Sequence, residues 1–323
     1  MKAIVQDVYG PVDVLELRDV PTPVAGPGDV LVRVRAAGVD PGVWHLMTGL
    51  PLLLRTMGFG LRRPKVRIRG RDVAGVVEAV GDGVTRFRAG DEVFGTSEGT
   101  FAEYACAPED RFVAKPANVT FEQAAAVPVS ALTALQALRD KGRVEPGQQV
   151  LVIGAGGGVG TFAVQLAKEY GARVTAVCST AKAELVRSIG ADEVVDYTRQ
   201  DFAEHGPRYD LVLDAAGNRP LRQLRRALAP GGTLVIIGGE GEGRWLGGTE
   251  RVLRAVLLAP FVRHKLRTLF TVERPEDLRS LREAIESGTV VPVVDRTFPL
   301  AEVPEAIRYA QRGQARGKVV VSL

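Results

Sequence analysis

The chain has 323 residues, of which 46% are hydrophobic and 25% are charged, and its formal net charge is +4. These proportions are typical of a globular protein and exclude a disordered or fibrous one, and the length predicts two domains. No run of about 18 uninterrupted apolar residues occurs in the sequence, so we expect no transmembrane helix and no membrane partner.

The N-terminal segment 1–10 alternates apolar and polar side chains and then reaches a Gly10-Pro11 turn. The segment lacks the apolar core and the small-residue cleavage site of a signal peptide, so it predicts a first strand and a cytoplasmic protein. The two cysteines, Cys106 and Cys178, are too few for a disulfide framework or a four-cysteine zinc lobe. We expect both to be reduced.

The first third of the chain is rich in β-favouring residues and in turns. Its short strand-like runs are separated by clusters of Gly and Pro such as Ala25–Asp29. This spacing predicts a compact, mostly antiparallel domain. The expected strands are Lys2–Val8, Leu15–Asp19, Asp29–Ala37, Val73–Val80, Glu92–Gly95 and Phe101–Ala107.

From about Thr120 the pattern changes to helices and then to alternating strands and helices. Parallel strands need helical crossovers, so this alternation predicts a doubly wound parallel sheet of the α/β class. The chain end is expected to return to the first domain. The expected helices are Phe121–Val127, Leu132–Lys141, Gly158–Tyr170, Lys182–Ile189 and Leu221–Leu228, with two later ones near Pro275 and Ala301. The expected strands are Val150–Gly154, Arg173–Ser179, Glu193–Asp196, Leu211–Ala215, Thr233–Gly238, Thr268–Val272 and Lys318–Leu323, and Val290–Asp295 is expected to be extended.

The segment Val150–Gly160 runs from an apolar strand through a glycine-rich turn into a helix. Glycine permits a tight turn, the approach of backbone amides to a pyrophosphate and close helix–strand packing, and a helix N-terminus attracts phosphate. Ala155 takes the first glycine position of the dinucleotide fingerprint, but the flanking strand, helix and second strand are all present. The segment predicts a nicotinamide-dependent oxidoreductase. The cofactor-binding residues expected here are Gly156, Gly157, Gly158 and Val159.

The end of the second expected strand indicates which nicotinamide cofactor is bound. An NAD-preferring site usually has Asp or Glu there, to hold the ribose 2′-hydroxyl. This chain has Ser179, which can donate a hydrogen bond, and Lys182, which is either a cation for a 2′-phosphate or a solvated helix residue. We therefore expect NADPH rather than NADH. Tyr197, after the next strand, either flanks the adenine or the phosphate or is an ordinary strand-end tyrosine.

Other cofactor contacts are expected where strands of the parallel sheet end, because open α/β sheets bind ligands at the carboxyl ends of their strands. The residues in question are Ala216, Gly217, Asn218, Gly238, Gly239, Phe270 and Val272.

Several short motifs occur in an order and at a spacing that resemble those of the medium-chain dehydrogenase/reductase superfamily. They are Ala36–Pro41, Gly70–Val77, Val80–Val84, Ala89–Val93, Gly99–Tyr104, Leu132–Ala134 and Ala315–Val319, together with the glycine turn. The chain is most similar to the zinc-independent branch that includes quinone oxidoreductases. The resemblance implies a GroES-like, mostly-β substrate domain at 1–121 and 267–323, a Rossmann NADP-binding domain at 122–266, a cofactor between the two, and a homodimer.

The chain departs from the zinc-dependent members of this superfamily at their ligand positions. Those relatives have a catalytic cysteine where this chain has Asp40, and a His-Glu pair where it has Arg71-Asp72. One Asp cannot replace a Cys/His/Glu set, so we expect no metal. Without a Lewis acid, alcohol oxidation is harder, whereas quinones and α,β-unsaturated carbonyls delocalise the charge of an incoming hydride themselves.

The resemblance also implies roles for single residues. Asp40 would border the nicotinamide and the substrate in a loop, either positioning them or capping a local turn. His45 follows in the same loop, near the expected cleft. It either protonates an enolate, with solvent as the alternative proton source, or is an ordinary surface histidine. Thr133 would lie near the nicotinamide carboxamide or bond to a helical carbonyl. The terminal motif Arg316, Gly317 and Lys318 would approach the cofactor.

Two basic stretches, Arg55–Arg71 and Arg251–Arg267, are either solvated surface or a flap and rim that attract an anionic substrate or NADPH. Our leading hypothesis is an NADPH-dependent, zinc-independent reductase of a small electrophilic acceptor, namely a quinone, an enone or an enoyl thioester. The alternatives are a metal-free NAD(P)-dependent alcohol or carbonyl dehydrogenase, and a nucleic-acid- or partner-binding protein that retains NADPH as a structural ligand. We expect no nucleic-acid partner, because the basic residues are not part of a recognisable nucleic-acid-binding module.

Overall fold

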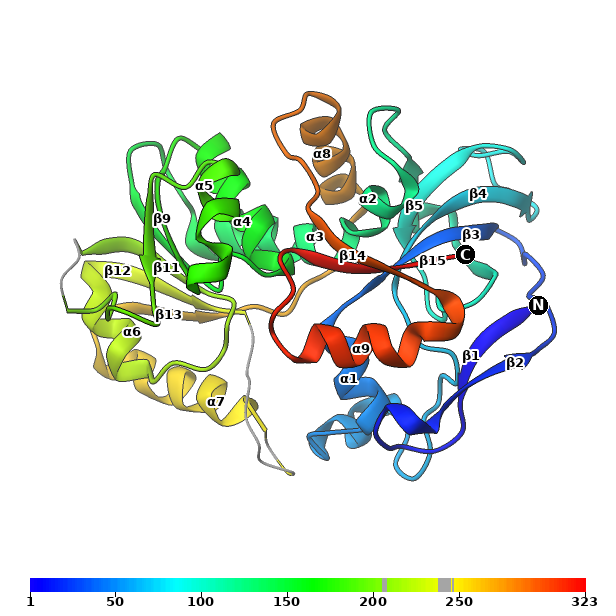
Figure 1. The fold of residues 1–323 in the computed structure, drawn as a ribbon, viewed down its shortest axis with the longest axis horizontal. Coiled ribbons are helices and arrows are strands. Elements are labelled where there is room, and N and C mark those ends of the chain that lie inside the picture. Colours follow the sequence, from blue (N-terminus) through cyan, green and yellow to red (C-terminus); the bar gives the residue numbers. More distant parts are fainter. Residues whose placement is uncertain (205–207, 238–244, 246) are drawn as a thin grey trace. The chain divides into compact units, whose positions relative to one another are not determined.

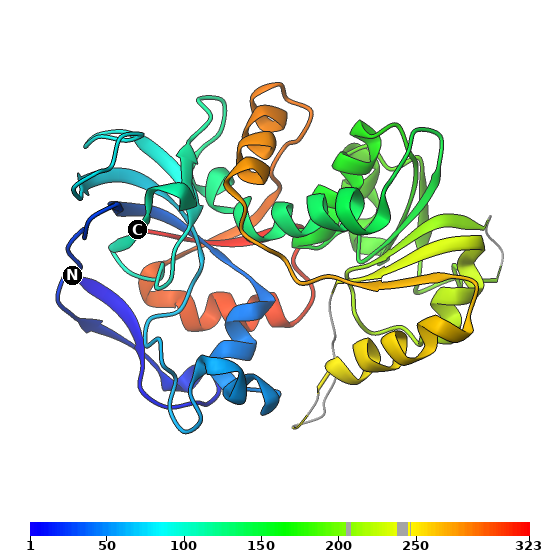
Figure 2. The same ribbon diagram turned by 180° about the vertical axis from the view of Figure 1, so that it is seen from behind.

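The computed structural model describes all residues except 205–207, 238–244 and 246. The described chain forms two compact units, each with its own sheet (Figures 1 and 2). The first unit consists of Met1–Leu132, Val272–Gly288 and Pro292–Leu323. The second consists of Thr133–Thr271 and Thr289–Val291.

The second unit is built on a six-stranded sheet whose neighbouring strands all pair in parallel. Its order, β10-β9-β8-β11-β12-β13, reverses direction at β8, as in a doubly wound sheet. The expected α/β class is therefore confirmed. The strands are β8 (Gln149–Ile153), β9 (Arg173–Cys178), β10 (Glu193–Asp196), β11 (Tyr209–Asp214), β12 (Leu228–Ile236) and β13 (Lys265–Thr268).

Helices cover both faces of this sheet, with α4 and α5 on one face and α6 and α7 on the other (Figure 1). A parallel sheet covered in this way buries both of its faces, which accounts for the continuous apolar runs of β8 and β11. The helical segments are η4 (Ala137–Gly142), α4 (Gly158–Glu169), η5 (Thr180–Lys182), α5 (Ala183–Ser188), α6 (Leu221–Ala227), α7 (Thr249–Leu258) and η6 (Ala259–Phe261), and α3 (Pro128–Gln136) leads into this unit from the first.

The first unit contains a seven-stranded sheet in the order β14-β15-β3-β4-β5-β7, with β6 paired to β3, and a separate β1–β2 pair. All of its strand pairs are antiparallel except β14–β15, so the expected mostly-β GroES-like unit is confirmed. The strands are β1 (Lys2–Gln6), β2 (Leu15–Asp19), β3 (Asp29–Val39), β4 (Asp72–Val80), β5 (Glu92–Thr96), β6 (Tyr104–Pro108), β7 (Phe112–Ala114), β14 (Val294–Pro299) and β15 (Lys318–Ser322).

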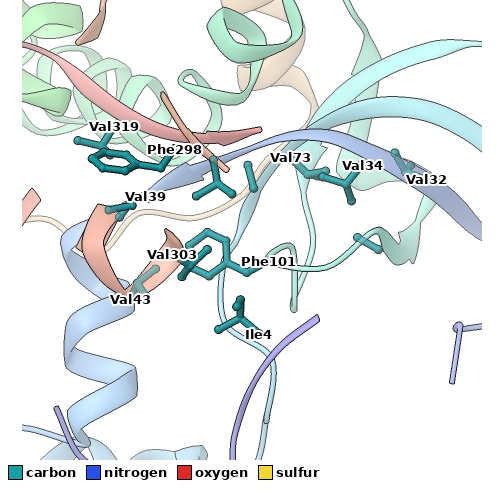
Figure 3. Packing of buried hydrophobic residues seen from close by; sticks show 14 of the residues in the cluster. Ile4, Val32, Val34, Val39, Val43, Val73, Phe101, Phe298, Val303 and Val319 are labelled. Carbon is teal, nitrogen blue, oxygen red and sulfur yellow. The ribbon is translucent and has the colours of Figure 1, made fainter. Parts of the chain in front are cut away.

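The core of the first unit joins segments that are far apart in the sequence. Figure 3 shows residues of one buried cluster, among them Ile4 of β1, Val39, Phe101, Phe298 and Val319 of β15, which come from both ends of the chain. The C-terminal strand therefore belongs to the same core as the N-terminal one. The helical segments here are η1 (Val12–Val14), α1 (Pro41–Thr48), η2 (Arg55–Phe59), η3 (Glu109–Arg111), α2 (Phe121–Ala125), α8 (Pro275–Glu286), η7 (Leu300–Glu302) and α9 (Val303–Gln311).

Two sequence-based expectations about local structure are wrong. The strand expected at Thr268–Val272 lies instead at Lys265–Thr268, because the partner strand β12 ends at Ile236, opposite Thr268. The expected loop after Asp40 is the helix α1, which begins at Pro41; proline is well suited to the first helical position.

Candidate functional site

The glycine-rich turn follows β8 directly. Gly154 has a φ of 83°, and its amide and that of Ala155 both donate to the Val177 carbonyl, at 3.1 Å each. The amide of Gly157 then donates to the Gly154 carbonyl at 3.0 Å, and α4 begins at Gly158. The first amides of α4 have no partner within the helix, so they form an anion-binding N-terminus at the end of a central strand.

Two glycines of this turn are required by space. A Cβ on Gly160 would lie 2.1 Å from the Gly154 carbonyl oxygen, so only glycine lets α4 pack this closely on the turn. A Cβ on Gly156 would lie 2.7 Å from Cδ of Lys182. The lysine stem therefore packs against the turn itself, which brings a cation to the phosphate-binding element. A glycine cradle, a bare helix N-terminus and a cation together fit a dinucleotide.

Asp196, which sequence reasoning overlooked, ends β10 beside Cys178 and the start of η5. Thr180 Oγ1 donates to one of its oxygens, and the amide and hydroxyl of Thr198 donate to the other, at 2.9 and 2.7 Å. The hydrogen bonds from Thr180 and then from Thr198 lower the pKa of Asp196. Its carboxylate is therefore ionised and accepts hydrogen bonds from neighbouring hydroxyls. Ser179 directly follows the last residue of β9.

An arginine that sequence reasoning missed lies beside Tyr197. The Arg219 guanidinium is 5.1 Å from the Tyr197 ring centroid, and the two residues line an open hollow of about 290 Å³ together with Arg199. Tyr197 is 47% exposed, so its ring offers a stacking surface. The sequence could have indicated Arg219, because it directly follows Ala216–Asn218, which were expected to contact the cofactor at a strand end.

The loop after β11 is held by buried polar contacts. Gly217 has a φ of 72° and its amide donates to Asp214 Oδ1 at 3.1 Å, whereas Ala216 is half-buried and Asn218 is exposed. The other Asp214 oxygen accepts a hydrogen bond from Arg251, and burial lowers the pKa of that arginine to about 10.

The remaining residues that were expected to contact the cofactor differ in their exposure to solvent. Gly238 and Gly239 lie outside the described residues. Phe270 and Val272 are 78% and 52% exposed. Thr133 is buried and its Oγ1 lies 2.9 Å from Oγ1 of Thr271, so its hydroxyl is fixed by a side chain.

A cluster of three charged residues lies buried in the first unit. The ammonium of Lys318 donates to Oδ1 of Asp40 and, at 3.0 Å, to Oδ2 of Asp72. The exposed fractions of Lys318, Asp40 and Asp72 are 2%, 8% and 0%. Ser130 Oγ donates to Asp40 at 3.3 Å and the Val129 amide donates to Asp72 at 2.8 Å. We call the three charged residues the Asp–Lys–Asp cluster.

The sheet register creates this cluster. Lys318 is the first residue of β15, and β15 pairs with β3 so that Val319 faces Val39, which places Lys318 next to Asp40 at the N-terminus of α1. Asp72 is the first residue of β4, on the other side of β3. Asp40 makes no side-chain cap bond to α1, so its carboxylate points to the lysine and not to the helix amides.

The charges in the cluster shift one another's pKa. Burial alone would raise the pKa of Asp40, but the Lys318 ammonium and hydrogen bonds outweigh burial and lower it. Burial and the charge of Asp40 raise the pKa of Asp72 well above its ordinary value. Burial would lower the pKa of Lys318, but the two carboxylates raise it. The cluster therefore pairs an ionised Asp40 with a protonated Lys318.

The other expected catalytic and terminal residues lie near these elements. His45 lies in α1 with Nδ1 3.0 Å from the Leu50 carbonyl oxygen, so that nitrogen is occupied by a backbone contact. Gly317 has a φ of 102° and a Cβ there would lie 2.5 Å from the Val293 carbonyl oxygen, which explains a glycine before Lys318. Arg316 is exposed.

Within the described ranges, no three His, Cys, Asp or Glu side chains come together in a way that could hold a metal ion. Asp40 and Asp72, which the resemblance to zinc-dependent relatives placed at ligand positions, have the Lys318 ammonium between them. A dication there would face the repulsion of the lysine, so the donor set does not fit zinc.

Comparisons with known proteins agree with this geometry. Residues 26–117 match the family model described as "Alcohol dehydrogenase GroES-like domain", and residues 189–321 match the one described as "Zinc-binding dehydrogenase". The chain is 34% identical to the mitochondrial NAD(P)H oxidoreductase RTN4IP1 of Mus musculus, covering 100% of this chain and 89% of the relative. It is 36% identical to the chloroplastic NADPH-dependent alkenal/one oxidoreductase of Arabidopsis thaliana, covering 99% and 79%.

A solved structure shows the same fold over the whole chain. The quinone oxidoreductase from Coxiella burnetii matches with a TM-score of 0.89 and 29% identity, covering 100% of this chain and 99% of that one. The chain belongs to the medium-chain dehydrogenase/reductase superfamily, alongside quinone oxidoreductases. It is an NAD(P)H-dependent oxidoreductase. None of the helices that the structure describes is long and apolar enough to span a bilayer.

Proposed function

We propose that this protein is an NADPH-dependent reductase of quinones or activated alkenes that works without zinc. The Asp–Lys–Asp cluster carries this proposal, because it puts a fixed ammonium where a zinc-dependent dehydrogenase needs metal ligands. A reductase without a Lewis acid is suited to acceptors that delocalise negative charge themselves. The Arabidopsis relative is named an alkenal/one oxidoreductase and the Coxiella relative a quinone oxidoreductase, and both names support this class of acceptor.

The preference for NADPH follows from the cations around the glycine turn. We propose that Lys182, packed on Gly156, and Arg219, stacked on Tyr197, hold the 2′-phosphate with the Ser179 hydroxyl. The Asp196 carboxylate is already engaged by threonine hydroxyls, so it is poorly placed to accept from an NAD ribose.

The remaining cofactor contacts are proposed on the predictions made from sequence. NADPH, when bound, supplies a hydride to the acceptor. The turn amides would bind its pyrophosphate. Further contacts are proposed for Gly157, Gly158, Val159, Thr133, Ala216, Gly217, Asn218, Gly238, Gly239, Phe270, Val272, Arg316 and Gly317.

Asp40 is proposed to position a ligand. Its Oδ1 accepts from both Lys318 and Ser130, and its carboxylate shares a side-chain hydrogen bond with Asp72. Oδ2 is buried and has no N–H or hydroxyl partner among the described residues. A hydroxyl of the bound cofactor or substrate that reaches Oδ2 would donate a strong hydrogen bond to this ionised carboxylate. Lys318 acts through Asp40, since its ammonium donates to the Asp40 and Asp72 carboxyl groups. His45 stays a candidate proton donor, with solvent as the alternative.

One set of assays tests the proposal. Oxidation of NADPH and of NADH is followed with a quinone, an enone, an enoyl thioester and an aldehyde as acceptors. The reverse reaction is measured with an alcohol, and the same sample is analysed for metals. We expect turnover of the quinone or the alkenes with NADPH and no stoichiometric zinc. Turnover only with alcohols and stoichiometric zinc would contradict the proposal and favour an alcohol dehydrogenase.

Three further expectations stay proposals: the boundaries 1–121 with 267–323 and 122–266, a homodimer, and a cytoplasmic location. Sedimentation velocity tests the dimer, and limited proteolysis tests the boundaries. The mouse and Arabidopsis relatives are named as mitochondrial and chloroplastic, so cell fractionation is needed to test the location.

A further inference from the structure

The segment between α1 and β4 combines exposed apolar side chains with exposed cations. We call Leu53–Arg67 the apolar–basic loop. Four large apolar side chains of this loop face solvent: Leu53 at 43%, Met57 at 61%, Phe59 at 39% and Leu61 at 68% exposure. Globular proteins rarely leave such a group of apolar side chains together on the surface unless something binds there.

The charges in this loop all have one sign. No acidic residue occurs between Pro41 and Arg71 in the sequence. Arg62, Arg63 and Lys65 are exposed and form no ion pair with any residue that the structure describes, whereas Arg67 pairs with Asp7 at 2.5 Å. The exposed apolar group is therefore next to three cations that form no ion pair within the described part of the chain.

The loop is anchored at its base and is not a loose segment. Tyr9 Oη lies 2.8 and 2.7 Å from the carbonyl oxygens of Phe59 and Gly60, and the Lys65 amide donates to the Phe59 carbonyl at 2.9 Å. Arg55 donates to the Gly49 and Thr48 carbonyls, and its guanidinium lies 4.2 Å from the Tyr9 ring centroid. These contacts fix the base of the loop, and the four apolar side chains stay exposed on its surface.

Although the sequence predicted no membrane partner, we propose that the apolar–basic loop docks on an anionic lipid surface. Exposed apolar side chains beside cations are the combination that binds the boundary between lipid headgroups and acyl chains, because the apolar groups insert while the cations stay with the headgroups. A second copy of the same loop fits less well. A two-fold contact would bring six cations together with no acidic residue of the loop to neutralise them. Docking there would bring the enzyme to membrane-dissolved acceptors.

The test is co-sedimentation of the full-length protein with vesicles. One set contains phosphatidylcholine alone and the other contains equal amounts of phosphatidylcholine and phosphatidylserine. We expect binding to the anionic vesicles only, weakened by salt. Arg62→Glu/Arg63→Glu/Lys65→Glu should weaken it by at least about 100-fold, at roughly fivefold per lost cation. Met57→Ser/Leu61→Ser should weaken it without changing the charge.

The matched control is Arg35→Glu/Arg88→Glu/Arg279→Glu, which changes the net charge equally at exposed sites outside the loop and should keep vesicle binding within a few-fold of wild type. Circular dichroism checks that each variant is folded. Absent or equal binding to both vesicle types would overturn the proposal. So would a loop variant that only raises the KM for NADPH or a soluble quinone, because the loop would then belong to the substrate site. Concentration-dependent self-association abolished by the loop variants would assign it to a second copy.

Discussion

Replacing Lys318 by methionine tests the Asp–Lys–Asp cluster. The substitution keeps most of the side-chain volume but removes the ammonium that holds Asp40 and Asp72 together in the core of the first unit. Two carboxyl groups would then remain buried with no cation beside them. At least one ionised carboxylate would be uncompensated unless it took up a proton.

The loss of folding stability in Lys318→Met can be estimated from the distances in the Asp–Lys–Asp cluster. A carboxylate and an ammonium in hydrogen-bond contact, about 3 Å apart, attract by about 5–6 kcal/mol at an effective dielectric constant of about 20. The ionised Asp40 and the protonated Lys318 form such a pair. Protonation of the carboxyl groups relieves part of the loss, so the net cost is about 3–5 kcal/mol, as for other broken buried pairs. For a unit of this size, that lowers the melting temperature by about 6–20 °C.

The assay is thermal unfolding followed by circular dichroism at neutral pH. Lys2→Met is the control in the same unit, because it removes an exposed salt bridge to Asp19 and should leave the melting temperature nearly unchanged. Asp40→Asn/Lys318→Met should be more stable than Lys318→Met, since it also removes the uncompensated charge. If Lys318→Met melted like wild type, the account of a buried ion-pair cluster would be wrong.

Three further predictions concern the cofactor site and pH. Lys182→Ala should raise the KM for NADPH by about 10- to 150-fold in steady-state assays, because that is the effect of losing one hydrogen bond to a charged group. The KM for NADH should stay nearly unchanged, and equal changes in both would refute the 2′-phosphate assignment. Gly160→Ala should destabilise the fold by about 1–3 kcal/mol and weaken NADPH binding in calorimetry, because its Cβ would overlap the Gly154 carbonyl; Gly42→Ala, with open space around it, is the control, and similar effects of both would contradict the packing argument. The raised pKa of Lys318 stabilises the fold below its unfolded pKa of about 10.4, and this stability is lost as pH rises through the higher folded pKa. In denaturant titrations, raising the pH above that value should therefore lower the free energy of unfolding of the wild type but not that of Lys318→Met. Equal decreases in both proteins would refute this prediction.

Local patterns predicted much of the fold. The second unit follows from alternating apolar runs and helices, because each strand and each crossover is encoded over a few neighbouring residues. The prediction failed at the limits of the strand: Thr268–Val272 favours a strand by composition, but the pairing of β12 with β13 ends at Ile236 opposite Thr268. The helix α1 was missed because Pro41-Gly42 resembles a turn more than a helix start.

The candidate site divides in the same way. The glycine turn and Lys182 are close in sequence, and the structure packs Lys182 on Gly156. The contact of Asp40 with Lys318 could not be predicted, because it joins residues 278 positions apart and depends on the register of β15 against β3. Sequence reasoning therefore assigned these two residues separate tasks, whereas the fold makes them one ion pair.

The most direct test of the central claim is quinone reduction by the purified protein after treatment with a strong chelator. We predict that turnover with NADPH is unchanged by the chelator and exceeds turnover with NADH, because Lys318 and not a metal holds Asp40 in place. Activity that is lost on chelation and restored by zinc, or that occurs with NADH alone, would contradict the account.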